Sequence, residues 1–409
     1  MIRSNWRRML IRTALGLLLC VGATPADAGA ESLEAGQLVI VGGRLSPGHE
    51  AVYRAVLDAA IDDGRVGVIP LASGVPERSG PLTVQDFQQY AADNGRVFDT
   101  ELTNNAPEYA GTRECAKKLA ACGGLWFTGG NQNRITAAMR PASGDTPSYQ
   151  AVLGLLKRGG VVGGTSAGAA MMSDSMITGG TSRDAMLLGA NPGIDVPGVG
   201  YAPGMGYFHY GLVDQHFLRR GRFGRLMVAT TELGLDYGFG VSENRAMHVD
   251  LSQDRVTVIG DEGLTFLDLS DAEHADHGWS NARVSILSDG DVLDPTTGAV
   301  EAASARKPLS HPGVAGVPGV TFPNMWDPHV VGLMVRVLAM NPAQPVSATD
   351  GAFDYWMSAD EQTRFYGGAG AEDASLTAVG VRLDVMPRDG LDERIADRRA
   401  ELAAVDTDD

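Results

Sequence analysis

Short apolar runs alternate with longer amphipathic segments along the first half of the chain. Apolar runs typical of buried strands occupy residues 37–43, 65–73, 96–102, 124–130 and 161–166. Apolar positions at helical spacing occur between them, at residues 49–64, 83–95, 113–124 and 149–160. This alternation predicts an α/β fold with a mostly parallel sheet and helices on both faces.

After about residue 236 the pattern changes to closely spaced strands. They occupy residues 237–243, 246–250, 255–260, 263–269 and 282–293, and they predict an antiparallel extension at one edge of the sheet. Beyond residue 291 the chain is rich in Pro, Ala and Gly, with a helical stretch at 327–340 and a strand-like stretch at 375–386. We therefore expect a core domain at 33–290 and an extension at 291–409 that packs on the core, with a frayed acidic end.

The first 28 residues have the order of an export signal. Four arginines precede the apolar run 13–23, and Ala26 to Ala28 form a small-x-small cleavage site. The run is shorter than the roughly 20 residues of a spanning helix. We therefore expect cleavage and an exported protein without a stable membrane anchor, in the periplasm or outside the cell. Arg7 and Arg8 leave the general and the twin-arginine export routes both open.

Composition and charge limit the kinds of molecule and cofactor that the protein is expected to bind. The formal net charge of −17 argues against nucleic acid as a partner. Cys115 and Cys122 fall on one predicted helix, too far apart for a disulfide, so we expect free, buried thiols. The spacing of histidines and carboxylates does not suggest a metal site, and we expect no metal or cofactor. A homodimer is considered only because dimers are common.

A single hydroxyl stands out in the apolar run 160–172. Gly164 to Gly168 fit G-x-S-x-G, the strand-to-helix turn that exposes a nucleophile, here Ser166. The same residues also suit a tight turn that only serves packing. The strand end at Thr128–Gln132 is Gly-rich as well, and both ends would open toward one crevice.

An unusual group of charges follows one of the predicted strands. Its residues are Asp214, Gln215 and His216 at the strand end, then Arg219, Arg220, Arg222 and Arg225 on a predicted helix. A solvated basic helix face is the ordinary interpretation of such a run. Arg222 and Arg225 would be neighbours on one face. Because guanidinium groups bind carboxylates bidentately, we favour recognition of an anionic ligand group.

Four sequence blocks lie in order between about residues 36 and 260. They read FTGGNQNRI, GGTSAGAAMM, PGMGYFHYGLVDQHFLRRGRFGRL and GFGVSENRAM. Together they resemble the cyanophycinase family of serine peptidases, relatives of aspartyl dipeptidase. The resemblance implies a flavodoxin-like sheet similar to that of class I amidotransferases. It also implies the substrate cyanophycin, a poly-aspartate backbone with arginine on each side chain, which is cut to β-Asp-Arg dipeptides.

The resemblance also implies roles for individual residues. Ser166 matches the nucleophile, His216 the general base, and the N–H groups of Gly130 and Ala167 the oxyanion hole, which is chemically coherent. Where the family usually has a glutamate, this chain has Asp184, which we assign as the acid that orients His216. Asp214 is the alternative acid. The matching substrate-contacting positions are Gln132, Asp214, Gln215, Arg220, Arg222 and Arg225.

The charges of these positions suggest how a substrate would be held. Asp214 would receive a guanidinium, while Arg222 and Arg225 would hold aspartate carboxylates. The last block departs from the family's usual Asp-Glu-Asn-Thr-Ala, because Ser242 and Arg245 replace its first and fourth residues. Its Glu and Asn, at 243 and 244, are kept.

These patterns together indicate an exported serine exopeptidase that hydrolyses cyanophycin through an acyl-enzyme. One alternative is an isoaspartyl peptidase with another β-aspartyl peptide as substrate. A second is an α/β-hydrolase esterase, which uses serine, acid and histidine in that order but has its histidine nearer the C-terminus. A third is a non-catalytic protein that binds peptides.

Overall fold

The computed structural model describes residues 35–93, 95–309, 319–368 and 375–405. The predicted export signal at 1–28 and the last residues of the acidic end, from 406 on, lie outside the described residues. In the part that is described, no helix is both long and apolar enough to cross a membrane.

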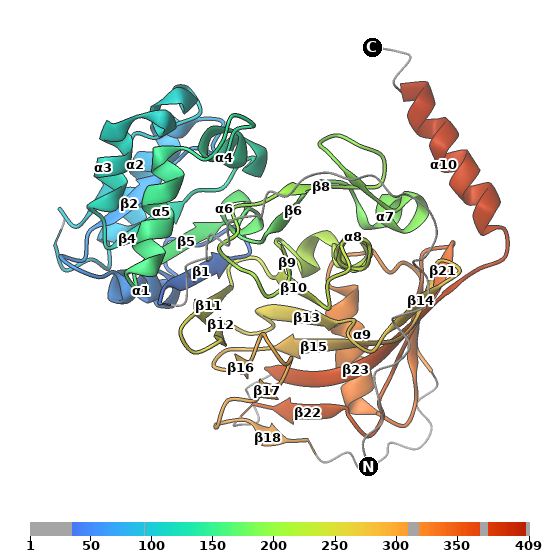
Figure 1. Cartoon of the computed structure of the whole chain (residues 1–409). Helices are drawn as coiled ribbons and strands as arrows, with labels where there is room; N and C mark the ends of the chain where they lie inside the picture. The colour runs from blue at the N-terminus through green and yellow to red at the C-terminus, as the bar shows by residue number, and fades with distance from the viewer. Residues whose placement is uncertain (1–34, 94, 310–318, 369–374, 406–409) are drawn as a thin grey trace, which may run out of the picture. The chain divides into compact units, whose positions relative to one another are not determined.

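The first sheet contains a run of five parallel strands (Figure 1). In spatial order its described strands are β17 (Val300–Glu301), β16 (Val292–Leu293), β12 (Arg255–Ile259), β11 (Ala246–Asp250), β1 (Gln37–Val41), β5 (Val161–Thr165), β4 (Gly124–Phe127), β2 (Val66–Ile69) and β3 (Val97–Asp99). The five strands from β1 to β3 in this order pair in parallel. β11, β12, β16 and β17 pair antiparallel to their neighbours.

Alternating strand residues face two helical layers on opposite sides of this sheet. The helical segments here are α1 (Glu50–Ala59), α2 (Pro76–Gln88), η1 (Pro107–Gly111), α3 (Arg113–Ala120), α4 (Gln132–Met139) and α5 (Pro147–Lys157). Val39 of β1 packs in a buried cluster with residues of α1 and α2. Leu38, its neighbour, packs with residues of α3 and α5. The predicted α/β class, a flavodoxin-like parallel sheet flanked by helices, is confirmed.

The two cysteines of this region behave as predicted. Cys115 and Cys122 are free and buried. Burial raises the pKa of both thiols, that of Cys122 to about 11, so neither carries thiolate character near neutral pH.

A second sheet contains most of the later strands. In spatial order its main path is β19 (Thr321–Phe322), β20 (Val346–Thr349), β21 (Phe353–Ser358), β23 (Leu376–Pro387), β15 (Gly278–Leu287), β13 (Leu264–Asp268), β10 (Tyr237–Val241) and β9 (Leu212–Asp214). Off this path lie β14 (Glu273–Ala275), β18 (Lys307–Pro308) and β22 (Arg364–Gly367). β9 and β10 are parallel, whereas β10, β13, β15 and β23 pair antiparallel.

The predicted antiparallel extension of the first sheet is present as β11 and β12. The structure differs from the expectation for β10, β13 and β15, which belong to the second sheet. β13 buries Phe266 in the cluster shared with the first sheet and Leu267 in a cluster on the other side. β13 is therefore buried on both faces, as a strand between two packed layers is, and not at a solvated edge of the first sheet.

The remaining elements surround the second sheet and the strand ends. A small sheet has the order β6 (Ser175–Gly179), β8 (Val199–Pro203) and β7 (Ala190–Pro192). The helical segments are α6 (Ala167–Ala170), α7 (Ser182–Leu188), η2 (Leu218–Arg220), α8 (Phe223–Glu232), α9 (Val330–Met340) and α10 (Leu391–Val405). The single basic helix expected after His216 is therefore split into η2 and α8, because Gly221 adopts a left-handed conformation with φ 56°.

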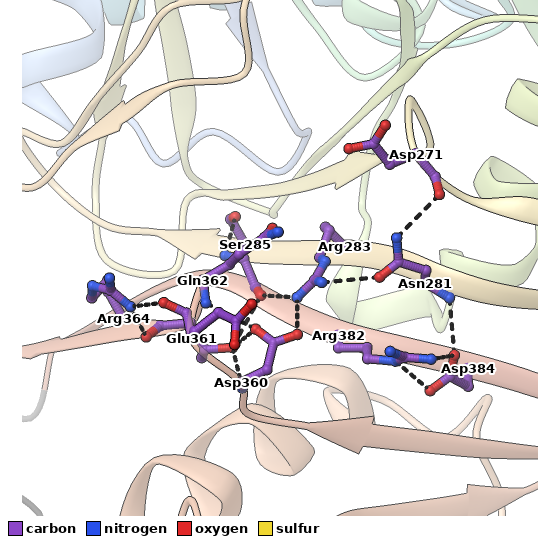
Figure 2. A network of polar contacts seen from close by, with 12 residues as sticks. Asp271, Asn281, Arg283, Ser285, Asp360, Glu361, Gln362, Arg364, Arg382 and Asp384 are labelled. Carbon is purple, nitrogen blue, oxygen red and sulfur yellow. Dashed lines mark hydrogen bonds and ion pairs between the residues drawn. The ribbon is translucent and has the colours of Figure 1, made fainter. Parts of the chain in front are cut away.

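Strands that follow residue 291 pair with strands that precede it. β23 runs antiparallel to β15, and β16 runs antiparallel to β12. Figure 2 shows the polar side chains on this seam: Arg283 of β15 donates to Asp360 at 2.7 Å, and Asp384 of β23 accepts the backbone N–H of Asn281 at 2.9 Å. The division at residues 290 and 291 stays a prediction.

Candidate active site

The ends of four strands bring the candidate catalytic residues together. Ser166 follows β5, and its N–H donates to the carbonyl of Val41 at the end of β1 at 3.0 Å. His216 follows β9, and its N–H donates to the carbonyl of Gly42 at 2.6 Å. Glu243 follows β10. Because β9 and β10 are parallel neighbours, the residues beyond them emerge at the same edge of the second sheet.

Ser166, His216 and Glu243 form a continuous hydrogen-bond chain. Ser166 Oγ lies 2.9 Å from His216 Nε2, and His216 Nδ1 lies 2.6 Å from Glu243 Oε1. The serine backbone has φ 55° and ψ −108°, an unfavourable conformation for a residue with a Cβ. Such strain is typical of the nucleophile turn between a strand and a helix. The arrangement provides a nucleophile, a base and an orienting acid in hydrogen-bond contact.

The surroundings of His216 favour its neutral form. Burial is the largest effect and lowers the pKa of the imidazole below its usual value, and the cations of Arg220 and Arg222 lower it further. The hydrogen bond to Glu243 acts in the opposite direction without reversing the shift. At neutral pH the ring is therefore uncharged. With Nδ1–H donating to Glu243, Nε2 is free to accept the serine proton.

Asp184 does not contact His216, which corrects its assignment as the orienting acid. It lies in the first turn of α7, where its carboxylate accepts from Thr181 Oγ1 at 2.8 Å and from Arg398 Nε of α10 at 2.7 Å. Thr181 caps this helix by accepting the N–H of Asp184. The carboxylate is therefore fixed by its own helix terminus and by α10, and Glu243 occupies the position beside the imidazole.

The two residues expected to form the oxyanion hole are Gly130 and Ala167, the residue that directly follows Ser166. A Cβ added to Gly129, the residue before Gly130, would lie 3.3 Å from Ser166 Cβ. Gly130 itself has φ 145°, and a Cβ there would lie 2.0 Å from the carbonyl oxygen of Ala72, so only glycine fits. Within the described residues, neither the N–H of Gly130 nor that of Ala167 donates a hydrogen bond. The assignment of these two groups as the oxyanion hole stays a prediction.

Asp214 and Arg225 bind each other, which corrects both of their expected contacts with substrate. Arg225 donates from Nε to Oδ2 at 2.7 Å and from Nη2 to Oδ1 at 2.6 Å, and Asp214 is 1% exposed. Burial would raise the pKa of Asp214, but Arg225 and Arg222 outweigh it and lower the pKa below its usual range. The pair is an internal ion pair, and Asp214 is likewise not the acid beside His216.

The other expected substrate residues differ in whether their side chains already form hydrogen bonds within the protein. Gln132 Nε2 donates to the carbonyl of Ile177 at 2.7 Å, and Arg222 Nη1 donates to the carbonyl of Gln215 at 2.7 Å. Burial lowers the pKa of Arg222 to about 10, which still leaves it charged at neutral pH. Gln215 Oε1 is buried and accepts no hydrogen bond within the described residues. Arg220 is exposed, and its guanidinium has no ion pair in the same residues.

A cavity opens beside the serine and the imidazole, at the two Gly-rich strand ends where the sequence analysis expected a crevice, and its lining includes Gly129 and Thr165. Its volume is about 290 Å³, and besides Ser166 and His216 its lining includes Arg44, Tyr53, Thr83, Asp86 and Trp126. None of these five side chains falls in the four blocks, so their sequence gave no signal. Glu243, in contrast, had one, because it is kept in the block GFGVSENRAM.

Comparisons with known proteins agree on the family. Cyanophycinase from Synechococcus elongatus is 30% identical over 258 residues, which cover 61% of this chain and 75% of the relative. Cyanophycinase from Geminocystis herdmanii is 29% identical over 266 residues, which cover 62% and 92%.

Comparisons with solved structures and with protein-family models add little support for the family. A solved peptidase from an acI-B1 Actinobacterium is 19% identical and covers 66% of this chain and 95% of its own, with a TM-score of 0.43. No protein-family model matches. The sequence similarity covers 75% of the first of the two cyanophycinases and 92% of the second. This chain is therefore a serine-type peptidase and belongs to the cyanophycinase family.

Proposed function

We propose that this peptidase hydrolyses cyanophycin and releases β-Asp-Arg dipeptides through an acyl-enzyme on Ser166. The observation that carries the proposal is the hydrogen-bond chain from Ser166 through His216 to Glu243. The curated relatives bear the name of an enzyme that acts on this polymer, which supports the choice of substrate.

The first half of the reaction forms the acyl-enzyme. Ser166 Oγ attacks the scissile carbonyl while His216 Nε2 accepts the hydroxyl proton. Negative charge then develops on the carbonyl oxygen, and the N–H groups of Gly130 and Ala167 stabilise it. The imidazolium returns the proton to the leaving amine as the C–N bond breaks. Glu243 stabilises the transient imidazolium and holds the ring in the tautomer that the step needs.

The second half of the reaction regenerates the enzyme. A water molecule attacks the ester carbonyl, and His216 Nε2 takes one of its protons. The ester bond to Ser166 Oγ breaks, the imidazolium protonates that oxygen, and the acyl product leaves as a carboxylic acid. One proton of the water has then passed through His216 to Ser166, and the other is released to solvent when the product acid ionises. The two steps require no group beyond the side chains, the backbone donors and water.

The order of the three residues along the chain separates this proposal from the esterase alternative. Here the order is serine, histidine, glutamate, at positions 166, 216 and 243. An α/β-hydrolase places the acid before the histidine. With Asp184 as the acid, the order along the chain would be serine, acid, histidine, as in an esterase. With Glu243 as the acid, the chain no longer has that order.

We also propose that the protein acts after export. The support is the arginine-rich start, the apolar run and the Ala26–Ala28 site, all within residues 1–28. Amino-terminal sequencing of the protein from a native-type host should begin at Gly29, in the periplasmic or the medium fraction. A full-length protein that stays in the cytoplasm would contradict export and leave the catalytic proposal untouched.

A panel of polymers tests the function directly. The purified protein is incubated separately with cyanophycin, poly-aspartate, casein and simple isoaspartyl dipeptides, and the products are identified by mass spectrometry. We expect β-Asp-Arg from cyanophycin and little product from the other three. An intact polymer together with cleavage of the isoaspartyl dipeptides would favour the isoaspartyl peptidase alternative over cyanophycin hydrolysis.

A further inference from the structure

The cavity beside Ser166 has the size of a single side-chain pocket. Its volume of about 290 Å³ lies just below the roughly 300–1,000 Å³ range of small-molecule sites. Two of its lining residues, Ser166 and His216, belong to the candidate catalytic chain. The cavity therefore lies within reach of a group that neighbours the bond attacked by the serine.

Rigid aromatic residues form part of the cavity. Tyr53 is 2% exposed and Trp126 is 1% exposed. Tyr53 packs edge-on against Phe87, with ring centroids 4.8 Å apart, and stacks on Tyr90 at 5.4 Å. These contacts fix the tyrosine ring, so the cavity does not need to form when a ligand binds. Aromatic faces also suit the flat, weakly hydrated guanidinium group.

One carboxylate of the cavity has no partner. Asp86 lies on α2, three residues after Thr83, so both side chains are on the same helix face. It is partly buried, and within the described residues it has no hydrogen bond and no ion pair. Burial raises the pKa of its carboxyl, with no neighbouring cation to oppose the shift. A cationic ligand would supply the missing partner.

The guanidinium of Arg44, whose charge is opposite to that of Asp86, also lines this cavity. Arg44 follows β1, its side chain is 74% exposed, and its Nε is 3.3 Å from Glu243 Oε1. The cavity therefore combines a partly buried acid with an exposed base. An arginine that is linked through its α-amine presents the complementary pair, a guanidinium at one end and a free carboxylate at the other.

The acid that the sequence suggested for the guanidinium is not available. Asp214 is already paired with Arg225, and Glu243 is hydrogen-bonded to His216. Asp86 is the acid that lines the cavity and remains unpaired in the described chain. We propose that this cavity binds an arginyl group of the substrate, with the guanidinium on Asp86 and the arginine carboxylate on Arg44. The inference rests on the proposed hydrolysis of an arginine-bearing polymer.

The first experiment tests whether the carboxylate of Asp86 contributes to the use of the substrate. Asp86→Asn should lower kcat/KM for cyanophycin by about 10- to 100-fold, because the guanidinium loses its charged partner. Labelling of Ser166 by a small fluorophosphonate, which carries no guanidinium for Asp86 to bind, should be unchanged. Glu77→Gln, an exposed acid at the other end of the same helix, is the matched control and should behave as wild type.

A second experiment removes the charge from the ligand instead of the protein. β-Asp-Arg and β-Asp-citrulline, which has an uncharged urea in place of the guanidinium, compete with the polymer as inhibitors. Wild type should bind the arginine compound at least tenfold more tightly, and Asp86→Asn should lose that preference. This comparison in wild type also tests the inference if Asp86→Asn does not fold.

The outcomes separate the inference from the function on which it rests. If wild type degrades cyanophycin and a folded Asp86→Asn protein degrades it equally well, the arginyl site is wrong and the function stands. Equal inhibition of wild type by the two dipeptides would overturn the site as well. If wild type leaves the polymer intact, the proposed function fails, and the arginyl site fails with it.

Discussion

Nδ1 of His216 lies 2.6 Å from Oε1 of Glu243, although the two residues come from different strands of the second sheet. β9 ends before the histidine and β10 ends before the glutamate, and the two strands are parallel. Their parallel pairing delivers a base and its orienting acid to the same edge, where Ser166 arrives from the first sheet. The site therefore depends on the contact between two sheets.

The role of Glu243 can be separated from that of Asp184 by matched substitutions. Glu243→Gln should lower kcat by about 10³-fold or more, because an amide favours the wrong imidazole tautomer. Asp184→Asn should keep kcat within about twofold of wild type, since its carboxylate bonds to Thr181 and Arg398. Steady-state kinetics with cyanophycin decide between them. A strong loss in Asp184→Asn with normal turnover in Glu243→Gln would restore the first assignment.

The acid limb of the pH profile should report His216. Burial lowers the pKa of this imidazole below its ordinary 6.5, and the neutral ring is the base. kcat/KM should therefore stay high at pH 6.5 and fall only as the pH drops through the lowered pKa.

Substitution of Arg220 tests the origin of that shift. Arg220 is one of the cations that lower the pKa of His216, so Arg220→Gln should move the acid limb to higher pH. Arg219→Gln, which removes an adjacent exposed cation, should move it less. Identical profiles for wild type and Arg220→Gln, or a wild-type limb above pH 6.5, would contradict this account of the electrostatics.

The sequence predicted the nucleophile and the base because each has a local signature. Ser166 lies in a G-x-S-x-G turn and His216 in a block with spaced arginines. Glu243 is kept in the block GFGVSENRAM, but this block does not indicate that its carboxylate contacts His216, since that contact depends on the parallel pairing of β9 with β10. The sequence pattern instead suggested antiparallel strands there. Register between distant segments is set by tertiary packing, which periodicity within one segment does not encode.

The parallel half of the fold was predictable for the opposite reason. Strands such as β1 are buried on both faces, as their positions Leu38 and Val39 demonstrate, and they give continuous apolar runs. The pairing of Asp214 with Arg225 was not predictable, because the same charges suit a ligand site and an internal ion pair equally. Only the positions of η2 and α8, separated at Gly221, bring the guanidinium onto the carboxylate.

The Asp214–Arg225 pair should contribute to stability and not directly to substrate contact. Arg225→Gln leaves a buried carboxylate with a weaker partner, and the free energy of unfolding should fall by about 3–5 kcal/mol. Because the pKa of Asp214 is lowered in the fold, the pair's contribution is present above the unfolded carboxyl pKa and is lost as pH falls through the lowered value. Urea unfolding at neutral pH measures the change.

Two controls accompany this measurement. The double variant Asp214→Asn with Arg225→Gln should recover part of the loss, because no unpaired charge remains buried. Arg220→Gln, at an exposed position, should unfold as wild type does. A loss below about 1 kcal/mol in Arg225→Gln would mean that the pair is not the internal ion pair described.

Gly43 lies against the imidazole of His216. A Cβ at this glycine would fall 2.3 Å from His216 Cε1, and its φ is +100°. Gly43→Ala should displace the ring and lower kcat by about 100-fold, since small displacements of a catalytic group are costly. Gly48→Ala is the matched control, because a Cβ there meets only Ser46 Oγ, at 3.8 Å. Equal turnover of the two alanine variants would contradict the contact.

The most direct test of the acyl-enzyme account is the turnover of cyanophycin by Ser166→Ala. Alanine keeps the Cβ of Ser166 and removes only its Oγ, so circular dichroism and thermal unfolding should match wild type. Wild type should release β-Asp-Arg and be labelled at Ser166 by a fluorophosphonate. The variant should lose turnover by several orders of magnitude, about 10⁴-fold or more, and resist labelling. A folded, uncontaminated Ser166→Ala protein that keeps more than about a tenth of wild-type turnover would contradict the central claim.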